Sequence, residues 1–247
     1  MDKKLNDISI SGSGKIAGGE YDNIRISGSG SMTGDVVANS VHISGSGRSE
    51  SIEAKEIKAS GSFHAAGHVT AGEIHVSGSA HIGGAIEAGE IKVSGSFHAN
   101  DAISAKTLGV SGSMHAESGI EADNAIISGA AHVKGLLNAE NIEITLNGAS
   151  KINEIGCERI YVKKPEAADF NFLGIFNFLG IFKFNAGSRS LTANSIEASE
   201  VCLENTHCAV VRAKRACIGE GCEIGRVEYE ESIEIHEGAV VKEQIKI

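Results

Sequence analysis

A Ser-Gly pair recurs at nearly constant intervals along the first half of the chain, and this repeat restricts the fold more than any other feature. Successive pairs are 16 or 17 residues apart over eight copies. They begin at Ser11, Ser27, Ser44, Ser60, Ser77, Ser94, Ser111 and Ser128. A fixed short period is typical of repeat proteins in which each unit packs against its sequence neighbours. The chain is therefore expected to fold as a stack of small, similar units.

Each unit contains three short segments in which apolar and polar residues alternate. In the unit that begins at Ser77 they are residues 80–82, 86–88 and 91–93. Alternation with a period of two predicts strands that are buried on one face. Seventeen residues are too few for a pair of helices. We therefore predict an all-β fold: a single-stranded parallel β-helix, a triangular solenoid with about 17 residues in each coil.

Composition agrees with a narrow core and argues against several classes of protein. The 247 residues include 31 Gly and 8 Phe but no Trp, and 41% of the chain is hydrophobic. A net charge of −10 argues against nucleic-acid binding, which needs clustered Lys and Arg. No signal peptide is evident in MDKKLNDISI, and five Cys without an export signal favour free thiols in the cytoplasm. We predict no cofactor, no nucleotide and no catalytic residue.

A histidine closes five successive repeats at the same position. Residues three and five places after the first Ser of a unit should face the core, so the residue between them should face outward. These histidines should form one exposed row, called here the histidine ladder: His64, His81, His98, His115 and His132. Three interpretations stay open, namely simple stacking, pH-tuned bundling or partner binding, and a metal site. A straight row converges poorly on one Zn or Cu ion.

The pattern breaks after Val162 at a Phe-rich insert. The hexad NFLGIF occurs twice, at 171–176 and 177–182, and six Phe occupy even positions. The segment is too short for a helix that spans a bilayer, but it suffices to dip into the membrane interface. A lid over the solenoid and a chain–chain contact are the alternatives. The predicted membrane-contact residues are Phe170, Phe172, Leu173, Ile175, Phe176, Phe178, Leu179, Ile181, Phe182 and Phe184.

Three regions follow from these patterns. Residues 1–162 should form about nine coils, residues 163–190 the insert, and residues 191–247 further coils of the same β-helix. The two ends of a β-helix present unpaired backbone groups and apolar side chains, which favour stacking of one copy on another. The candidate residues at these polymer ends are Ile8, Ile10, Ile16, Val240, Val241, Ile245 and Ile247.

An enzymatic alternative comes from residues 217–225. Their sequence, CIGEGCEIG, resembles the hexapeptide repeat of left-handed β-helix acyltransferases. The six-residue phase is not sustained elsewhere, and the long repeat runs at 17 rather than 18 residues. Such a transferase would also need one particular catalytic His in a cleft between subunits. Five equivalent histidines are more typical of architecture, so we predict that the chain is not an enzyme.

Two recurring motifs resemble those of the bactofilins, the polymer-forming cytoskeletal proteins of bacteria. One is the segment Ile26-Ser27-Gly28-Ser29, with its copies at 76–79 and 93–96, and the other is Ala71-Gly72-Glu73-Ile74, with its copy at 88–91. The resemblance implies a right-handed β-helix that polymerises end to end without nucleotide. It also implies a scaffold at the inner face of the cell membrane for cell-shape, envelope or motility proteins. The longer solenoid and the insert depart from the family pattern, which moves the membrane candidate to residues 170–184.

Overall fold

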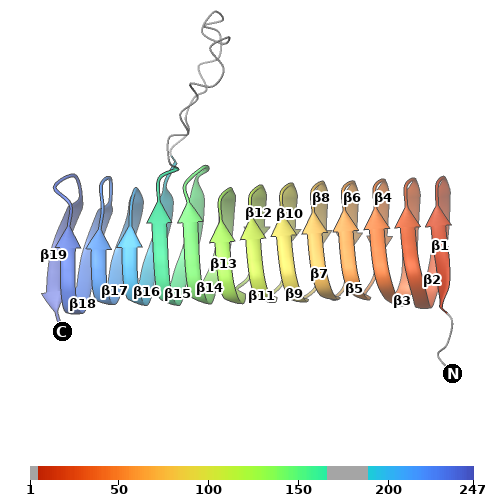
Figure 1. The fold of residues 1–247 in the computed structure, drawn as a ribbon, viewed down its shortest axis with the longest axis horizontal. Helices are drawn as coiled ribbons and strands as arrows, with labels where there is room; N and C mark the ends of the chain where they lie inside the picture. The colour runs from red at the N-terminus through yellow and green to blue at the C-terminus, as the bar shows by residue number, and fades with distance from the viewer. Residues whose placement is uncertain (1–4, 166–188) are drawn as a thin grey trace, which may run out of the picture.

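The chain winds into a rod of stacked β-coils. The computed structural model describes residues 5–165 and 189–247. Over these residues it is all-β, and the parallel strands form a solenoid of about 13 turns with roughly 17 residues per turn. The two ends of the chain lie at opposite ends of the rod (Figure 1). The predicted fold class is thus confirmed.

Nineteen strands make up the solenoid within the described residues. They are β1 Asn6–Ile10, β2 Ser13–Ile26, β3 Ser29–Ile43, β4 Ser46–Ser49, β5 Ile52–Ala59, β6 Ser62–Ala65, β7 Val69–Val76, β8 Ser79–Ile82, β9 Ile86–Val93, β10 Ser96–Ala99, β11 Ile103–Val110, β12 Ser113–Ala116, β13 Ile120–Ile127, β14 Ala130–Thr145, β15 Ser150–Lys163, β16 Leu191–Leu203, β17 Thr206–Ile218, β18 Glu223–Ile235 and β19 Val240–Lys246.

Each coil has three sides, as the alternation predicts. In β11, Ile103 and Ala105 are buried on one side, and Leu108 is buried after a corner at which the alternation shifts by one residue. In β12, Met114 and Ala116 are buried on the next side. We call these the first, second and third sides, and the same names apply to equivalent positions in every coil. One long strand therefore bends around a corner to supply two sides.

Equivalent residues of successive coils lie directly beside one another. Phe97 of β10 pairs with Met114 of β12, and the outward His98 pairs with His115. The coil before residues 166–188 and the coil after them are also neighbours, because Ser150 of β15 pairs with Leu191 of β16. The solenoid therefore continues across that segment.

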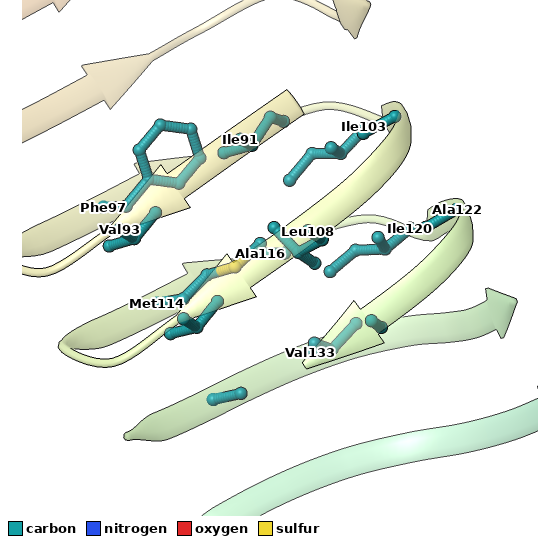
Figure 2. Packing of buried hydrophobic residues seen from close by; sticks show 14 of the residues in the cluster. Ile91, Val93, Phe97, Ile103, Leu108, Met114, Ala116, Ile120, Ala122 and Val133 are labelled. Atoms are coloured by element: carbon teal, nitrogen blue, oxygen red, sulfur yellow. The ribbon is translucent and has the colours of Figure 1, made fainter. Parts of the chain in front are cut away.

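The core is a continuous column of small and medium side chains. Figure 2 shows Phe97, Met114, Ile103 and Leu108 pointing into the interior of adjacent coils. On the third side, bulky and small residues vary from coil to coil, so that the ring of Phe97 lies beside Ala80 of the preceding coil. Phe97 is 1% exposed. Burying such a side chain stabilises the fold by about 1.5–3 kcal/mol.

The Ser-Gly corner is a site of close backbone contact. At Gly78 an added Cβ atom would overlap the carbonyl oxygen of Gly61 in the preceding coil. The corner is held there by backbone hydrogen bonds from Ser79 N to Gly61 O (2.9 Å) and from Gly78 N to Ala59 O (3.1 Å). In the described chain, positive φ values occur at three other glycines, so close approach explains the Ser-Gly repeat better than backbone conformation does.

Candidate functional site

The histidine ladder lies in one outward column of the third side. Strands β6, β8, β10, β12 and β14 each contribute one imidazole, and the in-register pairing aligns them. The ring centroids of His81 and His98 are 4.7 Å apart with an interplanar angle of 5°, and those of His98 and His115 are 4.8 Å apart. His64 stacks on His81 at 5.1 Å, whereas His132 meets His115 edge-on. The ladder is thus a stack of rings and not a convergent ligand set.

Two members of the ladder resist protonation. Partial burial lowers the pKa of His81 below its ordinary value, and the neighbouring His98 and His64 lower it further. Burial also lowers the pKa of His132, with further contributions from His115 and nearby lysines. A second proton on an adjacent ring places like charges close together. Each proton that binds to the ladder is therefore repelled by protons already bound to neighbouring imidazoles.

Cations continue the column at both ends of the ladder. Arg48 pairs with His64, and Lys151 pairs with His132. One carboxylate of the described chain hydrogen-bonds to a ladder histidine: Glu117 Oε1 lies 2.7 Å from His115 Nε2. The ammonium of Lys134 also donates to Glu117 (2.6 Å). Lys134 first, and His115 second, lower the pKa of Glu117 to about 2. The third side therefore carries a stripe of cationic and protonatable groups.

A long acidic groove occupies the first side. It has a volume of about 1060 Å³ and extends from β7 to β16, with Ala105, Ala122 and Ala139 in its lining. Its carboxylates are Glu87, Glu121, Asp123, Glu140, Glu154, Glu158 and Glu197. The only cation in its lining is Lys106. We call this set the acidic groove.

Sequence reasoning missed the groove, although one signal was present. The outward residue of the first side is Glu in alternate coils, at Glu53, Glu87 and Glu121, and the in-register pairing aligns these positions. Reading the polar residue of the second alternating segment down the repeat would have predicted an acidic column.

The second side carries an ion-pair column that also contains a possible metal-ligand set. Ligand atoms of Glu73, His75 and Glu90 lie within 4.8 Å of one another. The ammonium of Lys92 lies 2.8 Å from Glu90 and already balances its charge. Two coils before Glu90, Lys58 and His42 pair with Glu56 in the same way. The repeated arrangement indicates charge balance along stacked glutamates.

The candidate residues at the ends of the solenoid differ in their placement. Ile10 and Ile16 are buried, and Ile8 is partly buried. At the other end Val241 packs against the core, whereas Val240 is 56% exposed and Ile247 is 68% exposed. Ile245 pairs with the outward Glu228, which places it on the outside of the last coil.

The cysteines are free thiols with different environments. Cys208 and Cys222 are buried, whereas Cys157, Cys202 and Cys217 are partly exposed. Burial raises the pKa of Cys208 to about 11 and that of Cys157 to about 12. These thiols are therefore protonated at neutral pH and are poor nucleophiles.

The ten predicted membrane-contact residues, from Phe170 to Phe184, lie outside the described residues. The chain leaves the solenoid after β15 and rejoins it at β16, at the corner between the second and third sides. Lys163 and Lys164, which flank this segment, form ion pairs with Glu143 and Glu220, each at 2.7 Å. Among the residues with described positions, no helix is long and apolar enough to cross a membrane.

Comparison with known proteins gives one partial likeness. The chain is 38% identical over 98 residues to the Uncharacterized protein YhbF of Bacillus subtilis (strain 168), a stretch that covers 40% of this chain and 35% of that protein. The matched stretch is thus about a third of that relative's length, and its name states no activity. No family model matches the chain, and no solved structure matches it.

Proposed function

We propose that this chain is a non-enzymatic scaffold that polymerises end to end into filaments without nucleotide. The observation that carries the proposal is the state of the two terminal strands. Within the described residues, β1 pairs with β2 alone and β19 pairs with β18 alone. Each terminal strand therefore leaves one backbone edge unpaired, and such an edge is a template for pairing with another chain.

The apolar core reaches both edges, so end-to-end contact would bury apolar surface as well as pair backbone groups. Ile8 and Ile10 hold inward positions in β1, in register with Ile24 and Ile26. At the other end, Val241 and the partly buried Ile233 border the last coil. Apolar burial on association contributes about 25 cal/mol per Å² before the entropic costs of binding.

Two geometries of end-to-end contact are compatible with these strands. The first described coil supplies its second side through β1, and the last supplies the third and first sides through β19. A head-to-tail contact would combine them into one complete coil. A two-fold contact would instead pair like ends. End-specific variants distinguish the two, as described below.

Membrane association through the Phe-rich insert is the second element of the proposal. It rests on the apolar sequence of residues 170–184 and on the resemblance to bactofilins. The filament would then lie at the inner face of the cell membrane and organise envelope, cell-shape or motility proteins. The chain leaves and rejoins the rod at the corner between its second and third sides. In a head-to-tail filament with coils in register, every subunit would carry the insert at that same corner and could present it to one surface.

Negative-stain electron microscopy tests polymerisation directly. The full chain is compared with a version in which residues 168–186 are replaced by a short Gly-Ser linker. Filaments from both, with flotation on anionic liposomes for the intact chain alone, would support the scaffold and the membrane role. Filaments from the intact chain alone would assign the insert to subunit contact. Discrete trimers that bind an acyl-CoA donor would favour an acyltransferase instead.

Variants at the two ends define the contact. Ile10→Asp places a charge on the core edge, and Ser9→Asp, on the outward neighbour, is its matched control. Val241→Asp is the corresponding change at the other end. If contacts are head to tail, either core variant alone stops growth and leaves monomers. If contacts are two-fold, either variant alone leaves dimers. Normal filaments from both core variants would contradict end-to-end assembly.

A further inference from the structure

We propose that the histidine ladder of one copy docks into the acidic groove of a second copy, so that rods associate side by side when the imidazoles are protonated. The partner is another copy of this chain, and the contact uses the sides of the rod. It therefore goes beyond end-to-end assembly and does not require it.

The acidic groove is conspicuous for carboxylates that lack internal partners. On the other two sides several carboxylates are neutralised: Glu56 by Lys58, Glu90 by Lys92 and Glu117 by Lys134. Within the described part of the chain, none of the seven groove carboxylates makes an ion pair or a side-chain hydrogen bond. Aligned like charges lining a concave surface produce a negative potential that attracts a cationic partner.

The histidine ladder has the shape and chemistry that this groove requires. It is a straight row of stacked rings along the rod axis, extended by Arg48 and Lys151. The row repeats with the coil spacing, about 4.8 Å between parallel strands, whereas the groove carboxylates recur in alternate coils at Glu87 and Glu121 and in successive coils at Asp123 and Glu140. Both spacings are whole multiples of the coil spacing, so a favourable pairing recurs along the rod and the contact gains strength with length.

The two surfaces lie on different sides of the same rod, so one copy can use both. His98 belongs to the third side in β10, and Glu121 belongs to the first side in β13. A contact between unlike surfaces is heterologous, and a heterologous contact that does not close on itself continues from copy to copy. Side-by-side docking would thus produce flat arrays or bundles of rods.

Protonation sets the pH range of the contact. A net charge of −10, counted with neutral histidines, keeps copies apart. The charged groups that face the ladder are Arg48, Lys151, Lys134 and Glu117, and Lys106 is the one cation of the groove. Ordinary His and Glu titrate near about 6.5 and 4.3. Because the pKa values of His81 and His132 are lowered below the ordinary His value, association should strengthen as pH falls below about 6.5 and weaken again in acid that protonates carboxylates.

The chain offers a matched control, because five of its ten histidines lie outside the ladder. The ladder variant replaces His64, His81, His98, His115 and His132 by Gln. The control replaces His42, His68, His75 and His236 by Gln and keeps His207, which lies in the ladder's own column two coils beyond Lys151; a ladder variant that keeps His64 then has the same charge as this control at every pH to first order. This match matters because the sequence pI is about 5.5, where any protein associates more readily.

Sedimentation velocity and electron microscopy from pH 7.5 to 5.5 supply the readout. We expect the lateral association of the wild type and the control to strengthen by about tenfold over this range, and to weaken with added salt. The ladder variant should show no such increase. A groove variant, Glu87→Gln with Glu121→Gln and Glu140→Gln, should fail in the same way. Its control neutralises Asp35, Glu230 and Glu237, which lie outside the groove and outside the column of Glu53, Glu87 and Glu121. Thermal unfolding at pH 7.5 confirms that each variant is folded.

Mixing the two variants is the decisive test. The ladder variant keeps its groove, and the groove variant keeps its ladder, so an equimolar mixture should form one-to-one lateral pairs at pH 5.5 although neither forms them alone. Bundle width reports this contact separately from filament length, so a failure of end-to-end assembly would be distinguishable. Equal loss in ladder variant and control, or no pairing in the mixture, would overturn the proposal. So would ladder-dependent binding of phosphatidylglycerol vesicles without lateral association of the protein.

Discussion

Gly112 lies so close to Gly95 of the preceding coil that a Cβ atom on Gly112 would overlap the Gly95 carbonyl oxygen. Gly109, three residues earlier in the same coil, is different: an added Cβ would meet nothing nearer than the Ile91 carbonyl oxygen at 3.8 Å. Of these two glycines in one coil, only Gly112 occupies a position with no room for a side chain. The Ser-Gly repeat exists because the backbone itself fills the corner.

Gly112→Ala should therefore destabilise the rod strongly, whereas Gly109→Ala should be tolerated. The methyl group added at Gly112 would overlap backbone atoms of Ser94 and Gly95. Because backbone cannot rotate away as a side chain can, the two coils would have to separate. Overpacking of this kind costs about 1–3 kcal/mol or more. At Gly109 we expect a change within about 0.5 kcal/mol, as for most surface positions. Urea unfolding followed by circular dichroism measures both. Equal midpoints for the two variants would contradict the close approach.

The core makes a second prediction at Phe97. Its ring lies between Ala80 and Met114 in the third-side column, and the methyl group of Ala80 cannot fill the space that it leaves. Phe97→Ala should cost about 3–5 kcal/mol, and Phe97→Leu should cost less. Outward Ser96→Ala in the same strand is the control and should leave the unfolding midpoint nearly unchanged. A tolerated Phe97→Ala would indicate that the coils collapse around the cavity.

Much of the fold could be predicted from the sequence because the period of the repeat determines which residues of successive coils pair. Once Ser77 and Ser94 are aligned, His81 must lie beside His98, and the alternation assigns each residue to the core or the surface. The exact alternation also places Phe97 inside. Handedness stays a prediction, because the alternation is the same for either hand.

The acidic groove was harder to predict, since its carboxylates come from different parts of each coil. Glu121 is an outward strand residue, whereas Asp123 and Glu140 lie at the following corner in successive coils. Only the three-dimensional structure shows that the strand column and the neighbouring corner column line one concave surface. The lack of internal partners also depends on geometry, because Lys58, Lys92 and Lys134 lie elsewhere in the repeat and pair with Glu56, Glu90 and Glu117.

The contact between Glu117 and Lys134 predicts a local electrostatic effect. Lys134, and then His115, hold the pKa of Glu117 at about 2. Lys134→Met removes the larger contribution and should raise the pKa of Glu117 toward the ordinary value for Glu. Carbon-detected NMR titration of the side-chain carboxyl measures it directly. Lys106→Met, which removes a lysine that does not contact Glu117, is the control. An unchanged pKa in Lys134→Met would show that the ion pair is not formed in solution.

The histidine ladder should make the isolated rod less stable in acid. Burial and neighbouring imidazoles lower the folded-state pKa of His81, so the unfolded chain binds this proton more readily than the folded chain. Stability then rises with pH, and it is lost as pH falls below the unfolded value of about 6.5. His132 acts with the same sign. We expect the melting temperature to fall between pH 7.5 and 5.5, and to fall less in the double variant His81→Gln/His132→Gln.

The control for this prediction is the double variant His68→Gln/His236→Gln, which should retain the wild-type slope. Dilute protein in moderate salt is needed, because lateral docking of protonated ladders would stabilise the folded state by mass action and oppose the effect. The two influences have opposite signs and different concentration dependences. A melting temperature that falls with acid in dilute protein, and recovers as the concentration is raised, would separate proton repulsion within one ladder from attraction between two rods.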